Sequence, residues 1–257
     1  MKKLIAIMAF AGVVSANAQS IDDLTISGSF DFESEYVFRG QDIADSSFQP
    51  SVELGYSIWG GDSYLGVWSS TEVSNADSTA RNEVDFYIGY AATLEDYYPE
   101  LPLVADFGFT YYYYPDGDNV DRSREIYFGL AASGVILEPA LYYYYDFDLE
   151  QSLVELSVGH SFGLVDYLDV NASLELGAYA GVVSADDLNA GQGASERENG
   201  YTYAGITADV VYVLSDTSSA SVGARWAVNN DGSSTFANEA RGREHSLWFG
   251  TTLNFQK

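Results

Sequence analysis

Polar and apolar residues alternate along residues 24–38, and the same alternation recurs over most of the chain. In this first segment the even positions are mostly apolar, whereas the odd positions include Asp31, Glu33 and Glu35. Successive side chains of a β-strand point to opposite faces, so a period of two predicts strands with one apolar and one polar face. Residues 63–73 alternate less clearly, but they complete a predicted set of twelve strands. The others are residues 48–58, 83–92, 103–111, 125–132, 137–147, 154–158, 168–178, 204–214, 220–228 and 247–255.

The connections between the predicted strands tend to alternate between short and long. Residues 60–62 and 215–218 are short turns, whereas residues 181–199 form the longest polar connection. Short turns at one end and longer loops at the other are typical of transmembrane barrels. Most segments reach the ~9–11 residues that cross a bilayer as a tilted strand, and tyrosines gather near strand ends, as in residues 111–114 and 142–145. We therefore predict an all-β fold, a transmembrane antiparallel up-and-down β-barrel of about 12 strands.

A secreted β-sandwich or soluble barrel is the alternative fold, because an inward apolar face produces the same alternation. Pro139 lies within a predicted strand, although a closed barrel has no edge strand to accommodate its missing N–H group. We expect a β-bulge at this proline.

The first residues have the pattern of an export signal. Met1-Lys2-Lys3 gives a positive start, residues 4–16 are almost entirely apolar, and Ala16-Asn17-Ala18 fits an A-x-A cleavage site. The apolar run is too short for a membrane anchor, which needs ~20 residues. The sequence therefore predicts a signal peptide over residues 1–18, a single barrel domain over residues 19–257, and a location in the bacterial cell outer membrane.

The composition of the chain excludes several classes of function. Lys and Arg together number 11 and Asp and Glu 38, which gives a formal net charge of −27. Binding to nucleic acid needs basic residues for the phosphates, so we expect no nucleic-acid partner. The chain has no Cys, which excludes thiol catalysis, Cys-ligated zinc, iron–sulfur clusters and disulfides. We predict no cofactor and no metal.

The polar faces of the predicted strands bring acidic residues into the lumen, with few basic ones. The candidate lumen-lining residues are Asp31, Glu33, Glu35, Glu53, Glu83, Asp85, Asp106, Glu125, Glu138, Asp146, Glu155, Asp169, Glu175, Asp209 and Arg225, with Glu244, Arg39 and Arg81 as further candidates. Carboxylates in a lumen concentrate cations and repel anions. We therefore predict a channel for passive diffusion of small hydrophilic solutes or ions, with a preference for cations. The alternative is a non-conducting structural or surface-interaction barrel, its lumen filled by Tyr87, Tyr127, Tyr142 and Tyr144.

Two other features suggest chemistry only weakly. Clustered oxygens in the acidic loop 116–121 suit calcium, but the loop lacks the spacing of an EF-hand, which favours a solvated loop. The two histidines occur as His160-Ser161 and His245-Ser246. Adjacent strand residues point to opposite faces, so neither pair can form a nucleophile and base, and we expect no enzyme.

The segment Ser34-Glu35-Tyr36-Val37-Phe38-Arg39-Gly40, followed by Gln49-Pro50 and Tyr64-Leu65-Gly66-Val67-Trp68-Ser69-Ser70, resembles the opening of the TorF-type porin family of bacterial outer membranes. The resemblance implies an outer-membrane channel and supplies no catalytic residues. The chain departs from the common barrel ending, because Gln256-Lys257 follow Phe255. As partners we expect outer-membrane lipid and lipopolysaccharide, the barrel-assembly machinery, and small solutes or cations.

Overall fold

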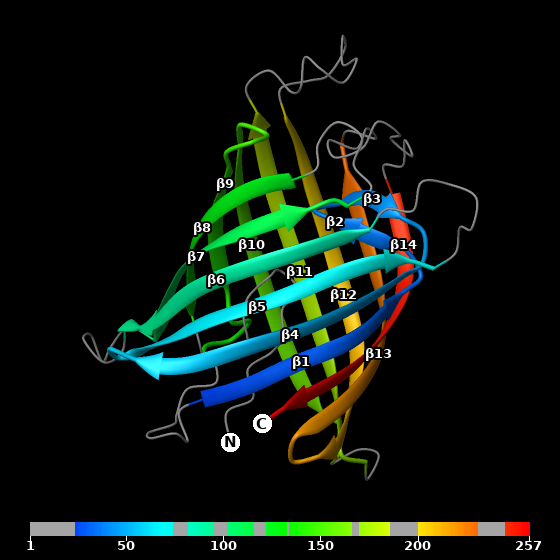
Figure 1. The fold of residues 1–257 in the computed structure, drawn as a ribbon. Helices are drawn as coiled ribbons and strands as arrows, with labels where there is room; N and C mark the ends of the chain where they lie inside the picture. Colours follow the sequence, from blue (N-terminus) through cyan, green and yellow to red (C-terminus); the bar gives the residue numbers. More distant parts are fainter. Residues whose placement is uncertain are drawn as a thin grey trace.

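The strands of the protein close into one antiparallel barrel, as the alternation predicts (Figure 1). The computed structural model describes residues 24–73, 82–94, 102–115, 122–132, 134–165, 170–185, 200–230 and 245–257. The barrel strands are β1 (Leu24–Glu33), β4 (Ser47–Ile58), β5 (Gly61–Glu72), β6 (Glu83–Thr93), β7 (Leu103–Tyr113), β8 (Arg122–Ala132), β9 (Ala140–Asp146), β10 (Gln151–Gly163), β11 (Ala172–Ala185), β12 (Gly200–Ser215), β13 (Ser218–Asn229) and β14 (His245–Gln256). Among these described residues, none lies in a helix long and apolar enough to span a membrane.

Strand β1 closes the barrel by pairing with β4 on one side and with β14 on the other. The chain end takes part in this seam, since the Ile26 N–H donates to the Lys257 carbonyl (2.9 Å) and the Lys257 N–H to that of Ile26 (2.8 Å). The residues after Phe255 therefore extend the ladder. A closed ladder leaves no sheet edge with unpaired backbone groups, which is the condition for strands to lie in hydrocarbon.

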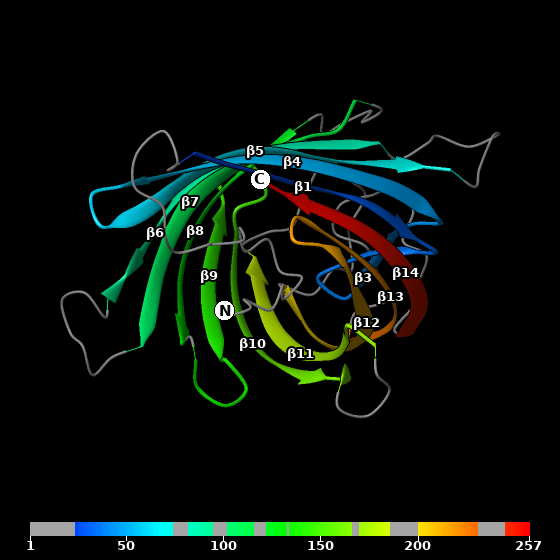
Figure 2. The ribbon, with the colours of Figure 1, turned by 90° about the horizontal axis from the view of Figure 1, so that it is seen from below.

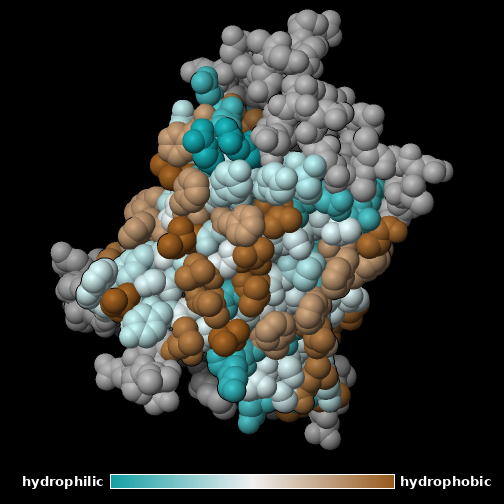
Figure 3. All heavy atoms as spheres, in the orientation of Figure 1, coloured by the Kyte–Doolittle hydropathy of each residue, from teal (hydrophilic) through white to brown (hydrophobic). Residues whose placement is uncertain are grey.

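The apolar faces of the strands point outward. Phe30 is 48% exposed, Ile88 56% and Leu247 62%, whereas the acidic residues of the alternate positions are buried inside. On the face drawn in Figure 3, hydrophobic residues cover the middle of the strands and hydrophilic ones lie toward the ends. This arrangement is the reverse of a β-sandwich or soluble barrel, which would bury its apolar faces.

The first predicted strand, residues 24–38, extends beyond the barrel strand that the structure shows. The barrel strand β1 ends at Glu33, and the chain then folds inward as a hairpin of β2 (Tyr36–Phe38) and β3 (Gln41–Ala44). Figure 2 shows this hairpin within the ring of strands. Tyr36 was expected to face lipid on the alternation, but its side chain is buried. The period of two continues through β2, so the pattern alone does not reveal where the chain leaves the wall.

The prediction of a strand over residues 137–147 is wrong at its start. Strand β9 begins at Ala140, and Leu137 and Glu138 have positive φ angles of 65° and 33° in the preceding turn. The Ala132 N–H donates to the Pro139 carbonyl (2.9 Å) at the end of this turn. Pro139 therefore precedes the strand, where no ladder N–H is required, and the expected bulge is not needed.

Boiling is expected to change the migration of the purified protein on an SDS gel. A closed ladder with no edge resists the detergent until heat opens it, so the unheated chain should run as a compact band and the boiled chain at its full mass. A water-soluble chain whose band does not shift would contradict the membrane barrel.

Candidate functional site

The inner face of the barrel carries acidic side chains that are almost entirely buried. Those exposed by less than a tenth are Asp31, Glu33, Asp42, Glu53, Glu72, Glu83, Asp85, Asp106, Glu125, Asp146 and Glu155. Arg225 is the one basic side chain buried to the same degree in the described part of the chain. Sequence reasoning missed Asp42, which lies in the inward hairpin, and Glu72, which continues the inner face of β5. The lumen wall thus has a large excess of carboxylates over basic groups.

Other predicted lumen residues lie elsewhere. Glu175 of β11 and Asp209 of β12 are half-buried on the inner face, and Glu35 lies at the bend after β1. The lumen prediction for Glu138 is wrong about its position, because this residue lies in the turn before β9 and not on a strand. Asp169, Glu244, Arg81 and the acidic loop 116–121 lie outside the described residues.

Inward-facing tyrosines lie flat against glycines of the neighbouring strands. Tyr64 is the ladder partner of Gly89, and a Cβ atom at Gly89 would lie 2.3 Å from the Tyr64 ring, closer than real Cβ atoms approach. The same cross-strand pairing joins Tyr87 to Gly66, Tyr127 to Gly108, Tyr142 to Gly129, Tyr179 to Gly205 and Tyr203 to Gly181. The rings therefore extend along the wall of the barrel and coat the lumen, a known way to stabilise glycine-containing strands.

Tyrosine hydroxyls hold several of the buried carboxylates in place. Tyr64 donates to one oxygen of Asp106 (2.7 Å) and Tyr142 to the other (3.0 Å). The Tyr203 hydroxyl donates to Glu155 (2.5 Å). These bonds fix where negative charge lies on the wall, because a buried carboxylate needs such donors.

In the part of the chain that the structure describes, two arginines lie in the lumen, and each contacts carboxylates of the barrel strands. Arg225 Nη2 lies 3.0 Å from Asp209 and 3.4 Å from Glu33, and all three side chains lie on the inner face near β1, β12 and β13. Arg39 lies at the tip of the β2–β3 hairpin and makes two hydrogen bonds to Glu125, from Nη1 (2.7 Å) and Nη2 (2.9 Å). Each arginine therefore compensates only part of the surrounding negative charge.

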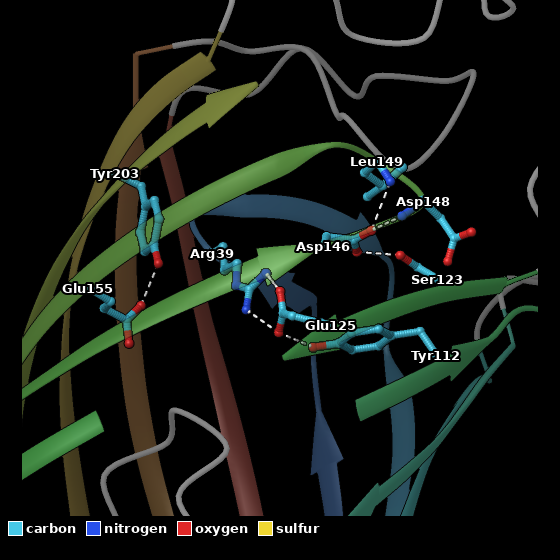
Figure 4. Close-up of polar contacts among 9 residues, drawn as sticks. All are labelled: Arg39, Tyr112, Ser123, Glu125, Asp146, Asp148, Leu149, Glu155 and Tyr203. Carbon is cyan, nitrogen blue, oxygen red and sulfur yellow. Dashed lines mark hydrogen bonds and ion pairs between the residues drawn. The ribbon is translucent and has the colours of Figure 1, made fainter. Parts of the chain in front are cut away.

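The hairpin is anchored to both sides of the barrel. The Glu125 carboxylate that binds Arg39 also accepts a hydrogen bond from Tyr112 (2.9 Å) (Figure 4). Across the lumen, Asn229 Nδ2 of β13 donates to the Gly40 carbonyl (2.6 Å). Gly40 has φ +75°, and a Cβ there would meet the Tyr203 side chain at 2.5 Å, so this turn and its close approach both require glycine.

The root of the hairpin packs against the same wall. Tyr36 donates to Glu83 (2.8 Å), and its ring lies 5.6 Å from that of Trp68. Tyr36 and Trp68 belong to the two segments that resemble the TorF-type porins, so the residues of the resemblance contact one another inside the barrel. The buried residues Ile43 and Ala44 join this contact as a small apolar cluster.

At the barrel end that carries the hairpin, Asp146 closes the turn between β9 and β10. Its carboxylate accepts from Ser123 and from the backbone N–H groups of Asp148 (2.9 Å) and Leu149 (2.8 Å) (Figure 4). Hydrogen bonds from Arg124 lower the pKa of Asp148 below its usual range at this exposed rim. Asp146 thus has a clear structural role, although it was predicted as part of the lumen lining.

In the described part of the chain, no group of three or more His, Cys, Asp or Glu side chains is placed to hold a metal ion.

A family described as "Bacterial protein of unknown function (Gcw_chp)" matches residues 16–186. No curated protein matches the sequence. Among solved structures, the chain is similar to the NanC porin, with 10% identity, a TM-score of 0.51, and 90% of this chain and 98% of the porin covered. It is also similar to LpxR from Salmonella typhimurium, with 9% identity, a TM-score of 0.47, and 89% of this chain and 99% of LpxR covered. At such low identity the likeness to the NanC porin supports the barrel fold alone.

Proposed function

The chain belongs to the Gcw_chp family of bacterial proteins of unknown function, and we propose that this member is an outer-membrane channel with a preference for cations. Its substrates would be small hydrophilic solutes or ions that diffuse passively. Signal-like residues 1–18, the outward apolar belt and the resemblance to TorF-type porins support the location and the class. The barrel would contact outer-membrane lipid and lipopolysaccharide, and it would be inserted by the barrel-assembly machinery.

The observation that carries the proposal is the charge of the lumen wall. Carboxylates such as Asp31, Glu53 and Asp106 line the inner face, with only Arg39 and Arg225 as inward basic groups in the described residues. A narrow lumen between low-dielectric walls strengthens the field of these charges, which attracts cations and excludes anions. The tyrosine rings lie along the wall, and several of them form one buried cluster with Leu153 and Val183 that occupies part of the lumen.

A non-conducting barrel is the second candidate, and the β2–β3 hairpin favours it. The hairpin crosses part of the lumen and is anchored at Glu125 and Asn229. In that case the protein would act structurally or through its outer loops. We do not propose an enzyme, since Ser246 is buried while the neighbouring His245 is exposed and stacks on Trp226.

The ion preference is tested by the reversal potential of the purified barrel in a planar bilayer under a KCl gradient. We expect a reversal potential of the sign that marks K⁺ as the more permeant ion. A unit charge about 4 Å from a passing ion contributes about 1 kcal/mol in water, as attraction for a cation and as repulsion for an anion, so Glu53→Gln should lower the cation-to-anion permeability ratio by up to about thirtyfold. Asp216→Asn, in the exposed turn between β12 and β13, is the matched control and should leave the ratio unchanged.

Either of two results would reject the cation-preferring channel. An anion preference contradicts the role of the lumen carboxylates, and the absence of current from a heat-modifiable, folded barrel favours the non-conducting candidate.

A further inference from the structure

We propose that the lumen contains a binding site for a guanidinium group, formed by Glu125, Tyr112, Tyr144 and Phe38, which Arg39 of the hairpin fills from within the chain. When Arg39 is absent, the site would take a small organic cation that carries a guanidinium group. The inference goes beyond the proposed channel activity, because the recognition of a guanidinium by this site does not depend on whether the barrel conducts.

The geometry around Arg39 is that of a guanidinium receptor. Its two terminal nitrogens bind the two oxygens of Glu125 at 2.7 and 2.9 Å, the paired arrangement that a planar guanidinium makes with a carboxylate. The central carbon lies 4.7 Å from the centre of the Phe38 ring and 4.6 Å from that of Tyr144. Aromatic faces at such distances attract a cation, most strongly when water is excluded.

The receptor residues are held in place without Arg39. Glu125 is 2% exposed and comes from β8, Tyr112 comes from β7, and Tyr144 comes from β9. The Tyr112 hydroxyl already donates to Glu125 (2.9 Å), and Tyr144 packs on Tyr127 and Tyr142. Only Phe38 belongs to the same hairpin as Arg39, so most of the site is a fixed part of the barrel wall.

Arg39 adopts a costly backbone conformation to reach this site. Its φ is +49°, in the left-handed region that a residue with a side chain rarely adopts. Gly40 follows with φ +75°, so the pair forms the tip of a two-residue hairpin turn, in which glycine or asparagine is usual at such angles. The contacts of the side chain with Glu125 and the two rings offset this cost, which indicates that the cation, and not the turn, determines the residue type.

A second buried acidic side chain lies beside the site. Asp85 is fully buried and is the ladder partner of Tyr112, whose hydroxyl donates to Glu125. Glu125 is the carboxylate that binds the guanidinium of Arg39. Removal of Arg39 leaves Glu125 as a buried carboxylate without its cation, a state that a free cation of the same shape would relieve.

The shape of the site selects among cations. A guanidinium is planar and weakly hydrated and donates two parallel hydrogen bonds to one carboxylate, whereas an ammonium group is a strongly hydrated point charge. The two flanking rings suit a flat cation that exposes its faces. We therefore expect methylguanidinium to bind better than methylammonium or sodium.

The test is chemical rescue of Arg39→Ala in the full barrel, measured in detergent by the thermal midpoint Tm. The variant should unfold at a lower Tm than the wild type, and methylguanidinium chloride at millimolar concentration should raise that Tm by about 2–4 °C. Methylammonium chloride and sodium chloride at equal concentration should raise it less. The wild type, whose site is filled by Arg39, should show no such difference among the three salts, and R39A/E125Q should lose the rescue.

An equal response to the three salts, or the same response in the wild type, would overturn the proposal. If R39A folds poorly, the yield of the compact band on an unheated gel replaces Tm. Recovery of that band by methylguanidinium alone then supports the site, and no difference among the salts rejects it. Because no current is measured, a failure here is distinguishable from a failure of the proposed channel.

Discussion

Replacement of residues 36–44 by a short Gly-Ser linker is expected to increase the single-channel conductance several-fold. These residues form the β2–β3 hairpin, whose buried side chains Tyr36, Ile43 and Ala44 pack beside Trp68 inside the barrel. Conductance depends on the free cross-section, so loss of an element that is anchored on both β8 and β13 should widen the path. The barrel ladder itself does not include the hairpin and should still close. Planar-bilayer recording of wild type and variant, under the same salt, measures the change.

The matched control is the same linker in place of the turn between β9 and β10, which lies at the same end of the barrel and connects two neighbouring strands of the wall. That variant should conduct as the wild type does. Both variants must give the heat-dependent band shift of a closed barrel before they are compared. An unchanged current in a folded hairpin variant would show that the hairpin does not limit passage.

The alternation of residues was sufficient to predict the barrel and most of its faces, for a simple physical reason. In a closed barrel each strand has one environment on each side, so Phe32 and Glu33 reveal their faces by polarity alone. The hairpin was not predictable in this way. Tyr36 and Phe38 continue the same period inside the lumen, and only the Arg39-Gly40 dipeptide marks the turn at which the inward segment reverses.

The tyrosines that lie along the lumen wall share a spacing in the sequence that is separate from the alternation of polar and apolar residues. A tyrosine is followed two residues later by a glycine in β5, β6, β8, β11 and β12, and both residues then lie on the inner face. The residues concerned are Tyr64-x-Gly66, Tyr87-x-Gly89, Tyr127-x-Gly129, Tyr179-x-Gly181 and Tyr203-x-Gly205. Without the register between strands the spacing does not show which glycine each ring covers. The sequence likewise does not show which carboxylate pairs with Arg39, since Arg39 and Glu125 are 86 residues apart in the chain.

A double-mutant cycle on Arg39 and Glu125 is expected to show strong coupling between these two residues. Removal of one partner from a buried ion pair typically costs about 3–5 kcal/mol, because the other charge stays buried without compensation. Arg39→Met and Glu125→Gln should therefore each lower the free energy of unfolding substantially. The free energy of unfolding lost in Glu125→Gln has an upper bound. If burial of the unpaired Arg39 costs more than the contacts of the hairpin contribute, the hairpin can leave the lumen and Arg39 can return to water. The double variant should be little worse than either single variant, because neither charge remains.

The exposed pair Arg124 and Asp148 provides the control for this cycle. Its hydrogen bonds, at 2.8 and 2.9 Å, are within 0.1 Å of those of Arg39, but the pair lies at the solvent-exposed rim. Water and salt screen such a pair, so its single and double variants should unfold almost as the wild type does. Because the two pairs have similar hydrogen-bond geometry and differ in burial, a strong coupling at Arg39 and Glu125 alone would show that burial is its source. Additive losses at Arg39 and Glu125 would mean that the hairpin is held by its other contacts, at Gly40 and Tyr36, and that the ion pair does not anchor it.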